Sequence, residues 1–173
     1  MPVMDRDILV LRDPKESWRR CSLAPLRGLV GVDFVSWREG LELDAGGRLL
    51  LDPDAPELTP ADIAAVSANG VPRLFLVDSS WRRLAVLRRS VAGAPLARRL
   101  PPIATAYPRR SESFPDPVAG LASIEALFAV TCLAGRPDLE LLDGYHFKDA
   151  FLAANRTLVG GTDAAHPAGR DRR

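Results

Sequence analysis

The stretch VPRLFLVDSSW, residues 71–81, decides the expected fold of the chain. Its apolar run Leu74–Val77 follows Pro72 and stops at Asp78, a pattern that indicates a short strand buried on both faces. In an open α/β sheet the ligand crevice lies just beyond the carboxyl ends of such strands. Asp78 and Trp81 occupy that place in the sequence, so we expect them at the functional site.

The segments around this strand predict parallel pairing. Thr59, Pro60 and Asp62 form a strong helix start, and Asn69-Gly70 is a typical C-terminal signal, so we expect a helix between them. A helix followed at once by a strand is the second half of a βαβ unit, whose strands are parallel. We also expect strands at 7–11, 32–37 and 98–108, an extended pair at 41–43 and 49–51, and helices at 81–89, 121–134, 137–143 and 145–155.

The composition is that of a soluble globular protein. The 173 residues are 47% hydrophobic and 26% charged, and they suffice for one compact domain or for a main domain with a small helical extension. No segment approaches the length of a membrane span, so a cytoplasmic protein without membrane contact is expected. Cys21 and Cys132 are too isolated for a disulfide framework or a metal site, and we expect no metal.

Charge is strongly segregated along the chain. Residues 71–110 contain nine arginines and one acid, Asp78, which gives this stretch a charge of +8, although the whole chain carries only +1. A basic zone around a site suits a polyanionic partner, because contacts to phosphates supply most of the non-specific affinity for nucleic acids. The alternative is an arginine-rich composition without function.

Three residues around the expected site admit two interpretations each. On residue type alone, Asp78 is a turn or capping aspartate and Trp81 a core aromatic. At a strand end in a basic zone, however, a carboxylate can hold an ammonium or accept a proton, and an indole face suits a sulfonium. Glu125, near the start of the helix expected at 121–134, is expected to be solvated or a cap partner, with contact to the site as the alternative.

The motif Asp78–Trp81 resembles the Asp-Cys-Ser-Trp motif of the SPOUT-related enzymes that transfer a 3-amino-3-carboxypropyl group from S-adenosylmethionine to small-subunit ribosomal RNA. It is also similar to the Asp-Thr-Trp of related enzymes that modify transfer-RNA uridine. Further pieces of the same rRNA-modifying family are matched in order, namely by Arg19–Ser22, Leu50–Pro53, Leu58–Asp62, Arg99–Pro101, Ala104–Pro108, Leu121–Ala126 and Phe147–Asn155. Each piece alone is weak, but together in one order they are specific.

The resemblance implies an α/β fold with a parallel-sheet, SPOUT-like trefoil-knot N-terminal half and a helical C-terminal part. We expect an N-terminal α/β domain at residues 1–95, a knot strand and helical domain at 96–159, and a disordered tail at 160–173. The family tends to act as monomers, so a monomer is expected.

The resemblance also implies S-adenosylmethionine as co-substrate, with Asp78 and Trp81 as catalytic residues. Trp81 would pack the methyl group, which leaves the aminocarboxypropyl carbon exposed, and Asp78 would orient or deprotonate N3 of the base. The implied cofactor-binding residues are Ser22, Asp78, Trp81, Leu100, Pro101, Ile103, Ala104, Tyr107 and Ser123. The implied RNA-binding residues are Arg82, Arg83, Arg109 and Arg110.

The leading hypothesis is therefore an aminocarboxypropyl transferase that acts on a uridine-type base of RNA, with ribosomal RNA on a pre-ribosomal subunit as the expected target and a role in ribosome biogenesis. Three alternatives stay open: a SPOUT-type RNA methyltransferase, a tRNA-uridine aminocarboxypropyl transferase, and a non-catalytic ribosome-assembly factor.

Overall fold

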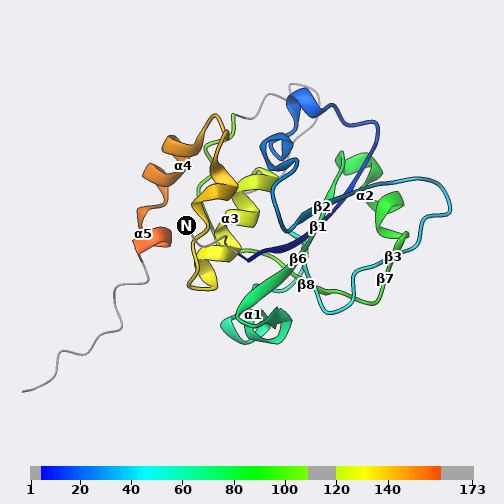
Figure 1. Cartoon of the computed structure of the whole chain (residues 1–173), viewed down its shortest axis with the longest axis horizontal. Helices are drawn as coiled ribbons and strands as arrows, with labels where there is room; N and C mark the ends of the chain where they lie inside the picture. The colour runs from blue at the N-terminus through cyan, green and yellow to red at the C-terminus, as the bar shows by residue number, and fades with distance from the viewer. Residues whose placement is uncertain (1–4, 109–119, 161–173) are drawn as a thin grey trace, which may run out of the picture.

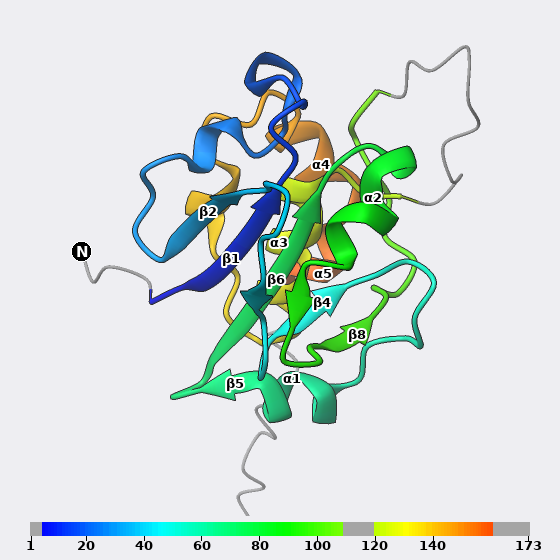
Figure 2. The same cartoon turned by 90° about the vertical axis from the view of Figure 1, so that its right-hand side faces the viewer.

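A six-stranded, mostly parallel sheet forms the centre of the structure, a computed structural model that describes residues 5–108 and 120–160. Its order is β2-β1-β6-β4-β8, and neighbours along this order are parallel, whereas β5 pairs with β6 in the antiparallel sense (Figure 2). A short separate pair is formed by β3 and β7. The strands are β1 (Asp7–Arg12), β2 (Val32–Ser36), β3 (Leu43–Asp44), β4 (Leu49–Leu51), β5 (Ser67–Ala68), β6 (Val71–Asp78), β7 (Val91–Ala92) and β8 (Leu96–Arg98).

Helices cover both faces of the sheet, so that the molecule has three layers (Figure 1). Helices α3, α4 and α5 lie on one face, and α2 with the β3–β7 pair lies on the other. The helices are α1 (Pro60–Val66), α2 (Trp81–Arg88), α3 (Ser123–Leu133), α4 (Lys148–Ala154) and α5 (Arg156–Gly160), with 3-10 turns η1 (Trp18–Arg20), η2 (Ala24–Leu26) and η3 (Leu139–Leu142). The expected α/β class with a parallel sheet is confirmed.

The apolar run of β6 joins the two layers, because alternate side chains of a strand point to opposite faces. Leu74 and Leu76 pack in the core cluster that contains Phe128 of α3, whereas Phe75 belongs to a second cluster with Leu87 of α2. The strand is therefore buried on both faces, as its sequence predicts.

The helix expected to end at Asn69-Gly70 ends earlier, and this prediction is wrong in its final turn. Helix α1 begins with the predicted capping box of Thr59 and Asp62 but stops at Val66. Asn69 and Gly70, with φ of 51° and 76°, form the tight turn between β5 and β6. Two consecutive residues with positive φ are what a type I′ hairpin turn requires, and the same dipeptide also suits a helix end.

Two strand predictions also need correction. Residues 41–43 and 49–51 do not pair with each other: β3 pairs with β7, and β4 lies in the main sheet between β6 and β8. The strand expected at 98–108 is displaced, since β8 ends at Arg98. Pro101 and Pro102 follow directly, and proline has no N–H to donate to a sheet.

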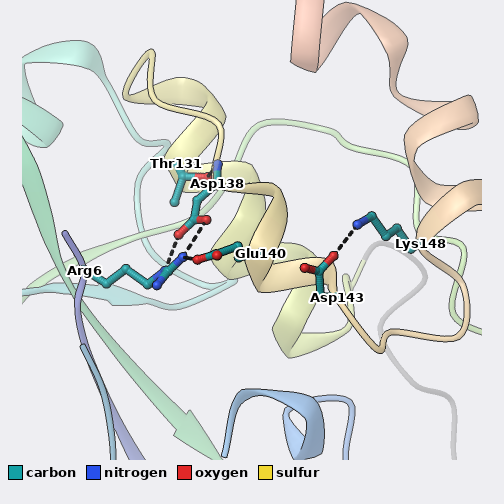
Figure 3. Close-up of polar contacts among 6 residues, drawn as sticks. All are labelled: Arg6, Thr131, Asp138, Glu140, Asp143 and Lys148. Atoms are coloured by element: carbon teal, nitrogen blue, oxygen red, sulfur yellow. Dashed lines mark hydrogen bonds and ion pairs between the residues drawn. The ribbon is translucent and has the colours of Figure 1, made fainter. Parts of the chain in front are cut away.

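An ion-pair cluster ties the start of β1 to the C-terminal layer (Figure 3). The buried guanidinium of Arg6 pairs with Asp138 and Glu140, and the amide N–H of Asp138 donates to Thr131 Oγ1 at 3.1 Å. Asp138 leads into η3 and Thr131 lies on α3. The division at residues 95 and 96 stays a prediction, as does the tail, of which residues 161–173 lie outside the described ranges.

Within residues 5–108 and 120–160, no helix is long and apolar enough to cross a membrane.

Candidate active site

A cavity of about 460 Å³ opens at the carboxyl edge of the parallel sheet. This volume lies within the range of small-molecule sites, roughly 300–1,000 Å³. Residues from the ends of β4 and β6, from α2, from the segment after β8 and from the start of α3 form its walls. The position is the one that the pattern of residues 71–81 predicts.

Six of the expected site residues line this cavity: Asp78, Trp81, Leu100, Pro101, Ile103 and Ser123. Ser22, Ala104 and Tyr107 are not among its lining residues. The structure thus brings together six of the nine expected cofactor-binding residues, two of which are also the expected catalytic residues.

Asp78 ends β6 and is held by residues from the neighbouring strand and the loop after it. Its register partner is Arg12, the last residue of β1, and Arg12 Nε lies 3.2 Å from Asp78 Oδ2. Within the described residues the Nε hydrogen is not aligned for a hydrogen bond, so this contact is an ion pair. The thiol of Cys21 donates to the same oxygen over 3.3 Å. Burial, together with the charge of Asp78, raises the pKa of Cys21 to about 11, so the thiol keeps its proton at neutral pH.

Trp81 begins helix α2 and is 52% exposed at the cavity. The helix starts here because Ser80 has an extended backbone, and its carbonyl accepts from the amides of Arg83 and Leu84 at 2.9 and 3.1 Å. The Ser80 amide itself donates to Glu16 Oε1 at 3.1 Å. The indole is therefore placed by a fixed helix N-terminus, with much of its surface open.

Two ion pairs fix α2 against the sheet. Arg83 pairs with the fully buried carboxylate of Asp13, which follows β1. Arg88 Nη2 lies 2.9 Å from Oδ2 of Asp52, which follows β4. Since α2 carries Trp81, both pairs contribute to the position of the indole.

The segment after β8 is held by two buried side chains from the C-terminal layer. Asn155 brackets the backbone of Ala104: its Oδ1 accepts from the Ala104 amide at 3.1 Å, and its Nδ2 donates to the Ala104 carbonyl at 2.8 Å. Glu125 accepts from the Ala106 amide at 2.9 Å and from the Thr105 hydroxyl at 2.6 Å. Backbone groups near Leu100–Ile103 are thereby fixed next to the cavity.

Glu125 is fully buried and accepts four hydrogen bonds. Besides the two bonds to the segment after β8, it accepts from the amide of Ala122 at 3.0 Å and from the hydroxyl of Tyr145 at 3.1 Å. Burial, followed by the charge of Glu125, raises the pKa of Tyr145 well above its usual value. Glu125 is thus a cap partner of α3, as expected, but it is not solvated; it links α3 to the segment that borders the cavity.

Two of the expected cofactor-binding residues support the site from its rim. Ser22 Oγ accepts from the amide of Ile124 at 3.4 Å and so touches the first turn of α3, directly beside Ser123. Tyr107 is 37% exposed and its hydroxyl donates to the carbonyl of Arg20 at 3.4 Å. Their predicted contacts with a bound molecule stay predictions.

The basic stretch of the sequence is largely neutralised in space. Among the arginines of this stretch that the structure describes, five form ion pairs with acids from other parts of the chain: Arg73 with Asp7, Arg83 with Asp13, Arg88 with Asp52, Arg98 with Asp62, and Arg99 with Glu57. Arg82 and Arg89 are exposed on or beside α2. Arg109 and Arg110, expected to bind RNA, lie outside the described residues.

Sequence reasoning did not assign site roles to Asp52, Asp54 and Arg99, which also line the cavity. The site position of Asp52 could have been predicted, because Asp52 follows an apolar run and parallel strands end at a common edge of the sheet. It was missed because residues 41–51 were interpreted as one extended pair. Among the described residues, no group of three histidines, cysteines, aspartates or glutamates is placed to hold a metal ion.

Proteins of known family and structure were compared with this chain. No family model matches the chain, and no curated protein matches it. Among solved structures, it matches the SAM-dependent rRNA:acp-transferase Tsr3 from Vulcanisaeta distributa, with a TM-score of 0.68 and 26% sequence identity. The predicted family resemblance is confirmed. The match with this aminocarboxypropyl transferase covers 91% of the present chain and 82% of the other.

Proposed function

We propose that this chain transfers the 3-amino-3-carboxypropyl group of S-adenosylmethionine to a uridine-type base of RNA, with ribosomal RNA as the target. The observation that carries the proposal is the match to an rRNA:acp-transferase over 91% of the chain. The cavity beside Asp78 and Trp81 supports it independently, because these residues were expected there from the sequence alone.

The walls of the cavity fit the co-substrate. Leu100, Pro101 and Ile103 form an apolar side suited to an adenine ring, and the backbone next to them is fixed by Asn155 and Glu125. The exposed indole of Trp81 offers a π face to a sulfonium, and cations bind favourably over such faces. Ser123, at the start of α3, is placed to bind a carboxylate or ammonium.

S-adenosylmethionine supplies an activated sulfonium, so the reaction is a single displacement that needs no covalent enzyme intermediate. The chain therefore contributes positioning and charge. Trp81 covers the methyl group and keeps it away from the base. Asp78 provides a negative charge on the cavity wall, close to the base nitrogen and the reacting carbon.

Several finer features belong to the same proposal. They are the SPOUT trefoil knot, the boundary near residue 95, a monomeric and cytoplasmic enzyme, and action on a pre-ribosomal subunit. The contacts of Ser22, Ala104 and Tyr107 with the co-substrate, and of Arg82, Arg83, Arg109 and Arg110 with RNA, also remain proposals. For Arg83 the ion pair with Asp13 supports a structural role beside any contact with RNA.

The test is incubation of the protein with S-adenosylmethionine and either small-subunit ribosomal RNA or transfer RNA, both from a strain that lacks the protein, followed by nucleoside mass spectrometry. The proposal predicts an aminocarboxypropyl mass on a uridine-type nucleoside of ribosomal RNA, with release of methylthioadenosine. Modification of transfer RNA alone would reassign the target. A methyl gain with S-adenosylhomocysteine would make the protein a methyltransferase, and no transfer would favour an assembly factor.

The matched variants are Asp78→Asn, which removes the charge and keeps the shape, and Glu42→Gln, which makes the equivalent change at an exposed site. Transfer should fall in the first and persist in the second.

A further inference from the structure

The carboxylate of Asp78 is held by a cation that is itself almost completely buried. Arg12 is 5% exposed, and its Nε lies 3.2 Å from Asp78 Oδ2. A buried guanidinium is costly unless charged and polar partners surround it. The Asp78 carboxylate is one of the partners that this buried guanidinium needs.

Arg12 is fixed from two further sides by the loop after β1. Its Nη2 donates to the carbonyl of Glu16 at 2.9 Å, and its guanidinium carbon lies 3.6 Å from the ring centroid of Trp18, at the start of η1. A planar guanidinium that stacks on an aromatic face has one preferred orientation. The loop thus locks the cation in the position where it meets Asp78.

The thiol of Cys21 completes this arrangement. It donates to Asp78 Oδ2, the same oxygen that faces Arg12, at 3.3 Å. Both contacts fall on Oδ2, while Asp78 also lines the cavity. The two contacts stabilise negative charge on Oδ2 and fix the rotation of the carboxylate.

We propose that Arg12 is a positioning residue for the transfer reaction: with the thiol of Cys21 it fixes the Asp78 carboxylate, so that Asp78 orients the base and the reacting carbon by charge and hydrogen bonding. In the displacement, N3 gives up its proton to water, its electron pair forms the carbon–nitrogen bond as the carbon–sulfur bond breaks, and methylthioadenosine leaves with the electron pair on sulfur. The role of Arg12 in the transfer reaction rests on the proposed function. The arrangement of Arg12, Cys21 and Asp78 does not depend on it.

The kinetic test is a double-mutant cycle between Arg12→Met and Asp78→Asn, read as kcat/KM for transfer. Arg12→Met should lower kcat/KM by about 10- to 100-fold, the scale of a lost charge-assisted interaction. In the Asp78→Asn background the same change should cost less than about 2-fold, because the carboxylate that Arg12 holds is gone. Arg12→Lys keeps the charge but not the planar fork, and it should recover part of the loss.

The control is Arg48→Met, which removes a guanidinium from another Arg–Asp pair of β1. Arg48 Nη1 lies 2.6 Å from Asp7 Oδ1, at the end of the strand remote from Arg12. It should lower the free energy of unfolding without changing kcat/KM. Equal losses from Arg12→Met in both Asp78 backgrounds, or a wild-type rate in Arg12→Met, would overturn the proposal.

A second readout needs no transfer activity and therefore separates this inference from the proposed function. Among the described residues, Asp78 and Arg12 are the charged groups that act on the Cys21 thiol, so the pH profile of Cys21 alkylation, resolved by peptide mass spectrometry, reports their arrangement. Asp78→Asn should shift the profile to lower pH, and Arg12→Met or Arg12→Gln should shift it to higher pH. If wild-type protein shows no transfer while these shifts appear, the function is wrong and the arrangement stands; unshifted profiles would refute the arrangement itself.

Discussion

Replacement of Glu125 by glutamine is the sharpest perturbation of the cavity wall. Its two oxygens accept four hydrogen bonds, from the amides of Ala106 and Ala122 and from the hydroxyls of Thr105 and Tyr145. Each oxygen receives one amide and one hydroxyl. A hydroxyl can turn and accept from an NH₂ group, but a backbone N–H cannot.

In either orientation of the glutamine side chain, one backbone N–H therefore faces another donor. A buried donor left without an acceptor costs about 1–3 kcal/mol, and the remaining bonds lose the strength that the negative charge gave them. We expect a total loss of about 2–4 kcal/mol in the free energy of unfolding, which corresponds to roughly 4–16 °C in Tm for a chain of this size.

The assay is urea unfolding together with calorimetric titration of S-adenosylmethionine, compared with the exposed control Glu42→Gln. Loosening of the segment after β8 should also weaken binding of S-adenosylmethionine by about tenfold or more, since that segment borders the cavity. Unchanged stability would refute the role of the buried carboxylate. Lower stability with unchanged affinity would refute the link between Glu125 and the cavity.

Three further outcomes follow from the same structure. Asn155→Ala leaves the Ala104 backbone without its two bonds and should weaken S-adenosylmethionine binding in the same titration. Asn155→Asp should not restore binding, because its second oxygen would face the carbonyl oxygens of Ala104 and Phe151 in place of a donor. Burial raises the pKa of Cys21 and of Cys132 to about 11, so the protonated thiols stabilise the fold fully below their ordinary pKa near 9 and lose this contribution as pH rises toward 11. The urea midpoint should therefore fall between about pH 9 and pH 11. The fall should be smaller in Cys132→Ala, which lacks one of the two thiols. The double variant of the exposed Arg82 and Arg89 to alanine should flatten the salt dependence of RNA binding by about one unit of slope per lost phosphate contact, and an unchanged slope would remove both from the RNA interface.

The placement of Asp78 and Trp81 could be predicted because the signals are local. An apolar run that ends at small polar residues indicates a buried strand, and the crevice rule for parallel sheets gives the rest. The burial of Glu125 could also have been predicted, because the helix around it is apolar on all sides and such a helix is buried throughout.

The partners of charged residues could not be predicted, because they come from distant parts of the chain. Arg88 meets Asp52, and Arg83 meets Asp13 from the loop after β1. A stretch that is strongly basic in the sequence therefore contributes much less positive charge to the surface than its composition suggests.

The end of helix α1 was missed for a different reason. Asn69-Gly70 suits a helix end and a hairpin turn equally well, and only the pairing of Ser67–Ala68 with β6 decides between them. Similarly, three-residue strands such as β4 have too few residues for their sequence pattern to name a partner.

The central claim is tested most directly by two preparations of S-adenosylmethionine, one labelled in the carboxyl carbon and one in the methyl carbon, each incubated with the protein and small-subunit ribosomal RNA. The account predicts that the carboxyl label enters the RNA and that the methyl label stays in the small-molecule fraction as methylthioadenosine. Entry of the methyl label into RNA, or entry of neither label, would contradict it.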